Sequence, residues 1–199
     1  MPIPHGAALQ LVSVQVGTAQ PLQAGNRRIL SAIGKRAVTG LVTVQPMGLV
    51  GDEQADLSVH GGLDKAVYAY PNEHYGFWQA QRREQGVSLF DEVLPPGFVG
   101  ENLSVSGLLE SEVFVGDELH FARCVLRVTA PREPCFKFNA VMGFNTASKL
   151  MAVQARCGFY LSVSQPGTLA AGEFFTLVPG RRALSIRQAM AGKLAKHLR

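Results

Sequence analysis

The stretch Gly48–Tyr70, GLVGDEQADLSVHGGLDKAVYAY, decides how the rest of the chain is interpreted. It places six ionisable side chains and four glycines between two apolar runs. Each glycine inside a helix costs roughly 1 kcal/mol relative to alanine, so this composition predicts a polar loop. The run Ala66–Tyr70 at its end predicts a strand, and a loop held by a strand is a common place for binding groups. The alternative is a long surface hairpin with an incidental histidine, His60.

Short β-rich runs on both sides of this stretch predict the fold class. Upstream, Leu9–Val16 alternates, and Ile29–Val44 contains two runs broken at Gly34 and Gly40. Downstream, strands are expected in or near Gly100–Ser106, Ser111–Phe121, Cys124–Thr129, Phe159–Ser164 and Glu173–Val178. About eight to ten strands with mostly hairpin-length connections favour a β-barrel or sandwich. The fold class is therefore expected to be mainly β with peripheral helices (α+β).

Three helices are expected around this core. One opens at Pro71 or Asn72 and ends at Gly86, one runs from Asn145 to about Cys157, and one follows Ser185. Within the first, Tyr75, Trp78 and Arg82 recur at helical spacing, which indicates a packing face. We expect residues 1–180 to form the β-barrel domain. The short C-terminal helix, 181–199, then packs on the barrel or on an oligomer partner, which leaves a homodimer open.

Composition narrows the class of protein. The 199 residues are 47% hydrophobic and 17% charged, which fits one folded domain. The formal charge of +4 fits an anionic ligand or merely a charged surface, and no Lys/Arg run with interleaved aromatics indicates a nucleic-acid polymer. No apolar stretch approaches the ~20 residues that span a membrane, and the start lacks signal-peptide features, so a cytoplasmic location is expected. The three widely spaced cysteines predict reduced thiols.

Cys135 is the cysteine with the most informative neighbours. Pro131 and Pro134 stiffen its loop, and Arg132 and Lys137 place positive charge nearby. Cations lower the pKa of a thiol and populate the thiolate, which attacks electrophiles or binds metals. The alternative is a buried structural cysteine, the role expected of the other two, Cys124 and Cys157.

Two weaker constellations involve the glycine-rich loop. Its acidic residues and His60 are able to hold a hard metal ion, although carboxylates on such a loop are as often turn formers; the residues are Asp52, Glu53, Asp56 and His60. A nucleophile–base pair of Cys135 with His60 is conceivable, but no third, orienting residue stands out. Lys35, taken alone, is more typical of a solvated charge at a turn.

Seven pieces of sequence, in order, resemble the MOSC domain family, which is named for the C-terminal domain of molybdenum cofactor sulfurase. They are Ser31–Lys35, Gly48–Gln54, His60–Gly62, Lys65–Val67, Gly100–Leu103, Gly116-Asp117 and Pro131–Asn139. Within the family, the chain is most similar to the bacterial proteins that confer resistance to 6-hydroxylaminopurine. The resemblance implies a MOSC-like β-barrel that binds a molybdenum cofactor of the molybdopterin type, an anionic pterin.

The resemblance also implies roles for individual residues. Cys135 would be the catalytic residue, either as a ligand of molybdenum or as a carrier of sulfur in a persulfide. The cofactor cleft would be lined by Lys35, His60, Gly61, Gly62, Lys65, Asn102 and Arg132.

The activity that the resemblance implies is reduction of N-hydroxylated bases or related N-oxygenated compounds. Because the sequence has no flavin, haem or iron–sulfur signature, the electrons would come from an external donor protein. Two alternatives stay open. One is a sulfur or cofactor carrier without turnover, and the other is an interaction protein that has lost the cofactor.

Overall fold

The structure is a computed structural model that describes residues 8–55, 61–88 and 92–197, which contain thirteen strands and four α-helices. The strands are β1 (Gln10–Val16), β2 (Gln20–Ala24), β3 (Arg27–Ser31), β4 (Arg36–Ala37), β5 (Val42–Gln45), β6 (Gly48–Leu49), β7 (Val67–Pro71), β8 (Leu103–Ser106), β9 (Glu118–His120), β10 (Val125–Pro131), β11 (Phe159–Gln165), β12 (Gly167–Leu169) and β13 (Thr176–Val178). The helices are α1 (Tyr75–Glu84), α2 (Phe136–Met142), α3 (Ala147–Gln154) and α4 (Ile186–His197), with 3-10 turns η1 (Leu63–Lys65) and η2 (Asn72–His74).

One large sheet dominates the molecule. Its strand order is β13-β9-β10-β11-β7-β8-β1-β4, and only the β7–β8 pair among these ladders is parallel. A three-stranded sheet, β12-β5-β6, and the separate β2–β3 hairpin complete the β structure in the described residues. The mainly β, α+β class expected from the sequence is confirmed.

The expected closed barrel is not present in the described residues, because no ladder joins the two outer strands, β13 and β4. The sheet nevertheless curls back toward its start. The backbone N–H of Leu11 donates to the carbonyl of Glu173 at 2.8 Å, and that of Phe175 donates to the carbonyl of Leu9 at 3.1 Å. The short β4 occupies the other side of the end of β1. The result is an open, strongly curled sheet.

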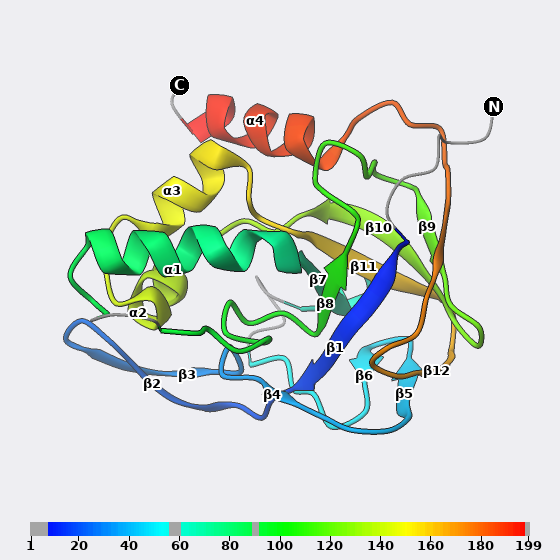
Figure 1. Ribbon diagram of the computed structural model, residues 1–199, viewed down its shortest axis with the longest axis horizontal. Helices are drawn as coiled ribbons and strands as arrows, with labels where there is room; N and C mark the ends of the chain where they lie inside the picture. Colours follow the sequence, from blue (N-terminus) through cyan, green and yellow to red (C-terminus); the bar gives the residue numbers. More distant parts are fainter. Residues whose placement is uncertain (1–7, 56–60, 89–91, 198–199) are drawn as a thin grey trace.

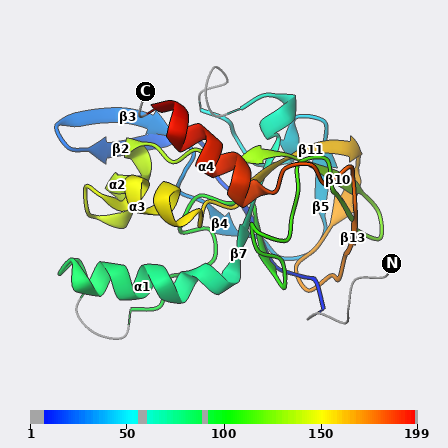
Figure 2. The ribbon, with the colours of Figure 1, turned by 90° about the horizontal axis from the view of Figure 1, so that it is seen from above.

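The helices gather beside the sheet and do not cover it evenly. Figure 1 shows α1, α2 and α3 together at one end of the molecule, with α4 lying above them. Figure 2 gives the view from above, in which α4 crosses between the β2–β3 hairpin and the strands of the large sheet. Helix α4 packs against β10 and α3. The division into residues 1–180 and 181–199 stays a prediction.

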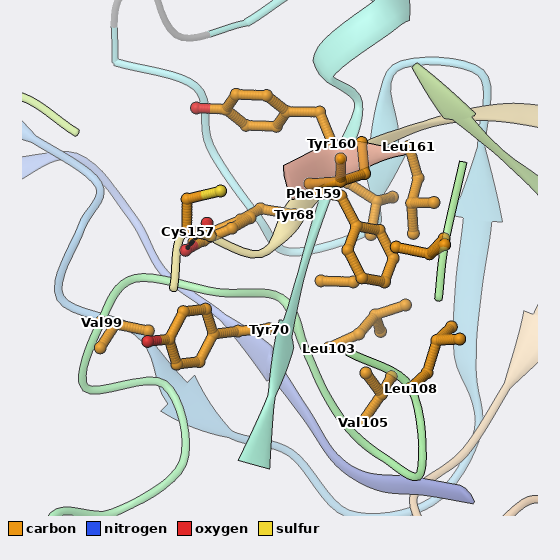
Figure 3. Close-up of a cluster of buried hydrophobic side chains, with 14 of the residues drawn as sticks. Tyr68, Tyr70, Val99, Leu103, Val105, Leu108, Cys157, Phe159, Tyr160 and Leu161 are labelled. Carbon is orange, nitrogen blue, oxygen red and sulfur yellow. Dashed lines mark hydrogen bonds between the residues drawn. The ribbon is translucent and has the colours of Figure 1, made fainter. Parts of the chain in front are cut away.

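The core explains why the strands and α1 form where they do. In β10 the alternate residues Leu126 and Val128 are buried, as period-2 spacing predicts. The expected packing face of α1, which is Tyr75, Trp78 and Arg82, is buried too. Figure 3 shows the centre of the core, where side chains of β7, β8 and β11 meet.

Two helices differ from the sequence-based expectation. Helix α2 was not expected, although its stop signal is visible in Gly143, which adopts a left-handed φ of 78°. Helix α3 starts after Thr146 and ends earlier than expected, because Ala155 turns the backbone left-handed at φ 50°. The expected start of α4 is confirmed, since Ser185 Oγ accepts from the N–H of Gln188 at 3.2 Å in a capping box.

Candidate functional site

A pocket lies where six segments meet. They are the loop after β3, the loop after β6, the start of β7, the loop before β8, the junction of β10 with α2, and the start of β11. It encloses about 650 Å³, including space open to solvent. The loop before β8 approaches closely because Gly100 has no side chain: a Cβ there would lie 2.6 Å from Ile33 Cγ1.

Five of the residues expected from the sequence line this pocket, namely Lys35, Lys65, Asn102, Arg132 and Cys135. They come from segments far apart in the chain, so the fold itself brings them together. Gly61 and Gly62 are not among the lining residues, and the N–H of Gly62 donates to Gln54 Oε1 at 2.8 Å. His60 lies outside the described residues, and so does the hypothetical Cys135–His60 pair. The roles of all eight residues stay predictions.

Cys135 occupies the residue just before α2. Its backbone is extended, with φ −129° and ψ 178°, and its side chain makes no capping hydrogen bond. The residue is half-buried and lines the pocket, so its thiol is accessible from the cavity. Cys124 and Cys157 are buried as expected, and burial raises the pKa of each thiol, to about 11 for Cys124. Cys135 is thus the cysteine that chemistry in the pocket can use.

Arg132 is a buried cation in the pocket wall. Its guanidinium lies 5.4 Å from the ring centroid of Tyr68 and 5.1 Å from that of Phe138, and Nη1 lies 3.2 Å from the sulfur of Met151. None of the ion pairs found in the described part of the chain includes it. Burial lowers the pKa of Arg132, but the nearby phenols and the Cys135 thiol outweigh this and raise it. A buried positive charge held by aromatic rings is suited to receive an anion.

Lys35 is held very differently. It pairs with Asp52, and both side chains are only 6% exposed. Asp52 also accepts from the N–H of Gly17 at 2.8 Å and from Asn102 Nδ2 at 2.8 Å. Asn102 in turn accepts from the N–H of Tyr68 at 3.1 Å, which fixes this cluster to β7. Lys35 therefore enters the pocket as half of a neutral pair, and not as the exposed turn charge that the sequence alone favours.

The carboxylates of the same loop do not form a metal site in the part that the structure describes. Asp52 is engaged by the three donors above, and Glu53 Oε2 accepts from the N–H of Ala19 at 2.7 Å. No group of three His, Cys, Asp or Glu side chains in the described ranges is arranged to hold a metal ion. Asp56 and His60, the other two residues of that hypothesis, lie outside those ranges.

Two tyrosines in the pocket were missed by reasoning from the sequence. Tyr68 on β7 and Tyr160 on β11 are direct cross-strand partners, and both line the pocket. Figure 3 shows the ring of Tyr160 pointing away from the other labelled core side chains. Burial raises the pKa of both phenols, so they stay protonated at neutral pH. The pairing of β7 with β11 joins residues far apart in the sequence, and no local pattern reveals it.

Fold and site together define a class: a curled, mainly antiparallel sheet with a pocket lined by a half-buried cysteine and by a buried arginine that forms no ion pair within the described residues. Comparison with known proteins gives the family. Residues 56–176 match the MOSC domain, so the chain belongs to the MOSC domain family, which is associated with the molybdenum cofactor.

Individual relatives agree with this assignment. The chain is 37% identical to protein YiiM of Escherichia coli K12 over 180 residues, which is 90% of this chain and 77% of that protein. It is 32% identical to a protein named reductase from Gibberella moniliformis, covering 84% of this chain but 29% of that protein. The crystal structure of YiiM from Geobacillus stearothermophilus superposes with a TM-score of 0.74 at 28% identity, over 94% of this chain and 85% of that one. No helix in the described ranges is long and apolar enough to cross a bilayer.

Proposed function

We propose that this protein binds a molybdopterin-type molybdenum cofactor in the pocket and reduces N-hydroxylated bases or related N-oxygenated compounds. The electrons come from an external donor protein. One observation carries the proposal: the half-buried Cys135 and the buried Arg132, which pairs with no carboxylate in the part of the chain that the structure describes, line the same cavity. Membership of the MOSC family and the similarity to a named reductase support it.

The residues present fit an anionic, sulfur-rich group. Four cations line the pocket, Lys35, Lys65, Arg132 and Lys137, against two carboxylates, Asp52 and Glu53. With Lys35 neutralised by Asp52, the positive charge of the described lining residues lies on Lys65, Arg132 and Lys137. Guanidinium and ammonium groups are the usual partners of a phosphate. A soft thiolate is a suitable ligand for a metal centre with soft sulfur ligands.

Each residue then has a defined task. Cys135 presents its sulfur to the metal from the stiff junction between β10 and α2. Arg132 holds the anionic part of the cofactor by charge-assisted hydrogen bonds. Asn102, tied to β7 and to Asp52, holds one side of the cleft in place. The bound cofactor supplies two-electron redox chemistry, in which an N–OH compound, two electrons and two protons give the amine and water.

Metal retention tests the proposal. The protein is produced in a host that makes the cofactor, and molybdenum is measured per chain in the purified wild type, in Cys135→Ala and in the control Cys124→Ala. We expect stoichiometric molybdenum in the wild type and the control, and a loss in Cys135→Ala. Full retention in Cys135→Ala would remove the proposed ligand.

Turnover and mass separate the enzyme from the carrier. We expect the loaded wild type to reduce 6-hydroxylaminopurine when a reductase or a chemical reductant supplies electrons. Mass spectrometry of the untreated protein is expected to show an unmodified Cys135. A labile extra sulfur on Cys135 together with no turnover would favour the persulfide carrier instead.

A further inference from the structure

The positive charge of the pocket is distributed unevenly, because Asp52 neutralises one of the lining lysines, Lys35. Its carboxylate is 94% buried and accepts three bonds, from Gly17 N–H, Lys35 Nζ and Asn102 Nδ2. These donors come from three separate segments: the link after β1, the loop after β3, and the loop before β8. Asp52 is therefore immobilised, and so is the ammonium group that it neutralises.

The neighbouring carboxylate has a different partner. Glu53 also lines the pocket, but its carboxylate accepts from the backbone N–H of Ala19 at 2.7 Å, and the residue is exposed. No ion pair to Glu53 is found in the described part of the chain. Two adjacent carboxylates thus add the same negative charge to the pocket, but only Asp52 cancels a lysine.

We propose that Asp52 determines which anions the pocket accepts, because it keeps Lys35 neutralised and so leaves anion binding to the other lining cations, Lys65, Arg132 and Lys137. The pocket then has one anion-binding end and one neutral, hydrogen-bonding end. It selects a ligand with a single clustered anionic group and discriminates against a second anionic group at the Lys35 end. This inference rests on the proposed function only in taking the ligand to be anionic.

The probe for a single clustered anionic group is inorganic pyrophosphate, titrated into metal-free protein by calorimetry at low and moderate salt. In Asp52→Asn, Lys35 loses its counter-charge and becomes an additional cation for the probe. We expect pyrophosphate to bind about tenfold more tightly, the effect of one added charge-assisted contact. The matched control is Glu53→Gln, which makes the same change in net charge without releasing a lysine. We expect its affinity to stay within about twofold of the wild type, because exposed charges are screened by salt.

A double variant tests the coupling directly. In Lys35→Met with Asp52→Asn, the ion pair is replaced by two uncharged side chains, an exchange that proteins often tolerate. We expect its pyrophosphate affinity to return to within about twofold of the wild type, since the gain of the single variant requires Lys35. This variant keeps the test valid if Asp52→Asn alone does not fold.

Three results would overturn the inference. The first is an equal gain in Asp52→Asn and Glu53→Gln, which would mean that net charge alone matters. The second is weaker binding in folded Asp52→Asn, which would mean that Asp52 only supports the pocket wall. The third is a gain that persists in the double variant. If the wild type, measured separately, binds no molybdenum, the proposed function is refuted, but the comparison of pyrophosphate affinities among the variants stays valid.

Discussion

Replacing Arg132 by methionine separates the two reasons why a protein keeps a buried cation. If Arg132 serves mainly to stabilise the fold, Arg132→Met unfolds the protein. If it serves mainly to bind an anion, the variant stays folded and loses the anion. The structure favours the second outcome, because Arg132 is buried and no ion pair in the described part of the chain includes it.

The magnitudes follow from its contacts. Two aromatic rings lie 5.4 and 5.1 Å from the guanidinium, and each such contact contributes about 0.5–2 kcal/mol. Removing a buried, unpaired charge offsets this loss, because burying an ion costs several kcal/mol. We therefore expect the free energy of unfolding of Arg132→Met to stay within about 2 kcal/mol of the wild type, or a change in Tm of no more than about 8 °C.

Anion binding should change far more. A hydrogen bond to a charged group contributes about 1.5–3 kcal/mol, so its loss weakens pyrophosphate binding roughly 10- to 150-fold. The assays are urea unfolding followed by circular dichroism, and calorimetric titration of the metal-free protein with pyrophosphate.

Arg156→Met provides the control. Arg156 also lies over an aromatic ring, at 4.6 Å from the centroid of Phe77, but it does not line the pocket and instead bonds to His74 Nδ1 at 2.8 Å. We expect Arg156→Met to lower the Tm and leave pyrophosphate binding unchanged. The reasoning fails if Arg132→Met binds pyrophosphate within twofold of the wild type, or if both variants weaken binding equally.

Three further predictions concern buried groups. The Glu110 side chain is 1% exposed and accepts two bonds, from the ring of a buried histidine and from a backbone N–H, each at 2.8 Å. Glu110→Ala leaves both donors without a partner, at about 1–3 kcal/mol each, so we expect Tm to fall by about 4–24 °C. Glu112→Ala, at an exposed site nearby, is expected to change Tm by less than about 2 °C. Of the three cysteines, we expect iodoacetamide at pH 8 to label only Cys135 in the native protein, because burial raises the pKa of the Cys124 and Cys157 thiols. Labelling of either buried cysteine in the native protein would contradict this. The raised pKa of Cys124 also predicts how the free energy of unfolding depends on pH. Because the thiol ionises at a lower pH in the unfolded chain than in the folded one, the contribution of Cys124 to stability is full below about pH 9 and declines toward pH 11. Urea midpoints at pH 8 and pH 10.5 measure this decline.

Local patterns in the sequence were enough for most elements of the fold. Alternation predicted the buried face of β10, helical spacing predicted the packing face of α1, and Ser185 predicted the start of α4. Helix α2 was missed because two prolines just upstream favoured a stiff loop, and its only clear signal is the glycine at its end. A barrel or sandwich was expected from the many short strands with hairpin-length connections, and the family resemblance also implied a barrel. The strand ladders depend on long-range pairing, and in the described residues they form an open sheet.

The pocket was predicted unevenly for the same physical reason. Cys135 and Arg132 stood out because prolines and charges surround them within a few residues. The neutralisation of Lys35 by Asp52 was not foreseen, since those residues are 17 positions apart and meet only in the folded chain. Tyr68 and Tyr160 were missed because their proximity depends on the pairing of β7 with β11.

The hydrogen bonds between the start of β1 and residues 172–175 determine when during synthesis the sheet can form completely. The first strand leaves the ribosome early, yet its neighbour on one side is β8 and on the other the segment before β13. Sheets built from such distant pairs fold slowly, since long loops must close before any ladder forms. The cavity, too, needs groups from Ser31 to Tyr160. A ligand can therefore load only after Tyr160 has been translated and its strand has paired.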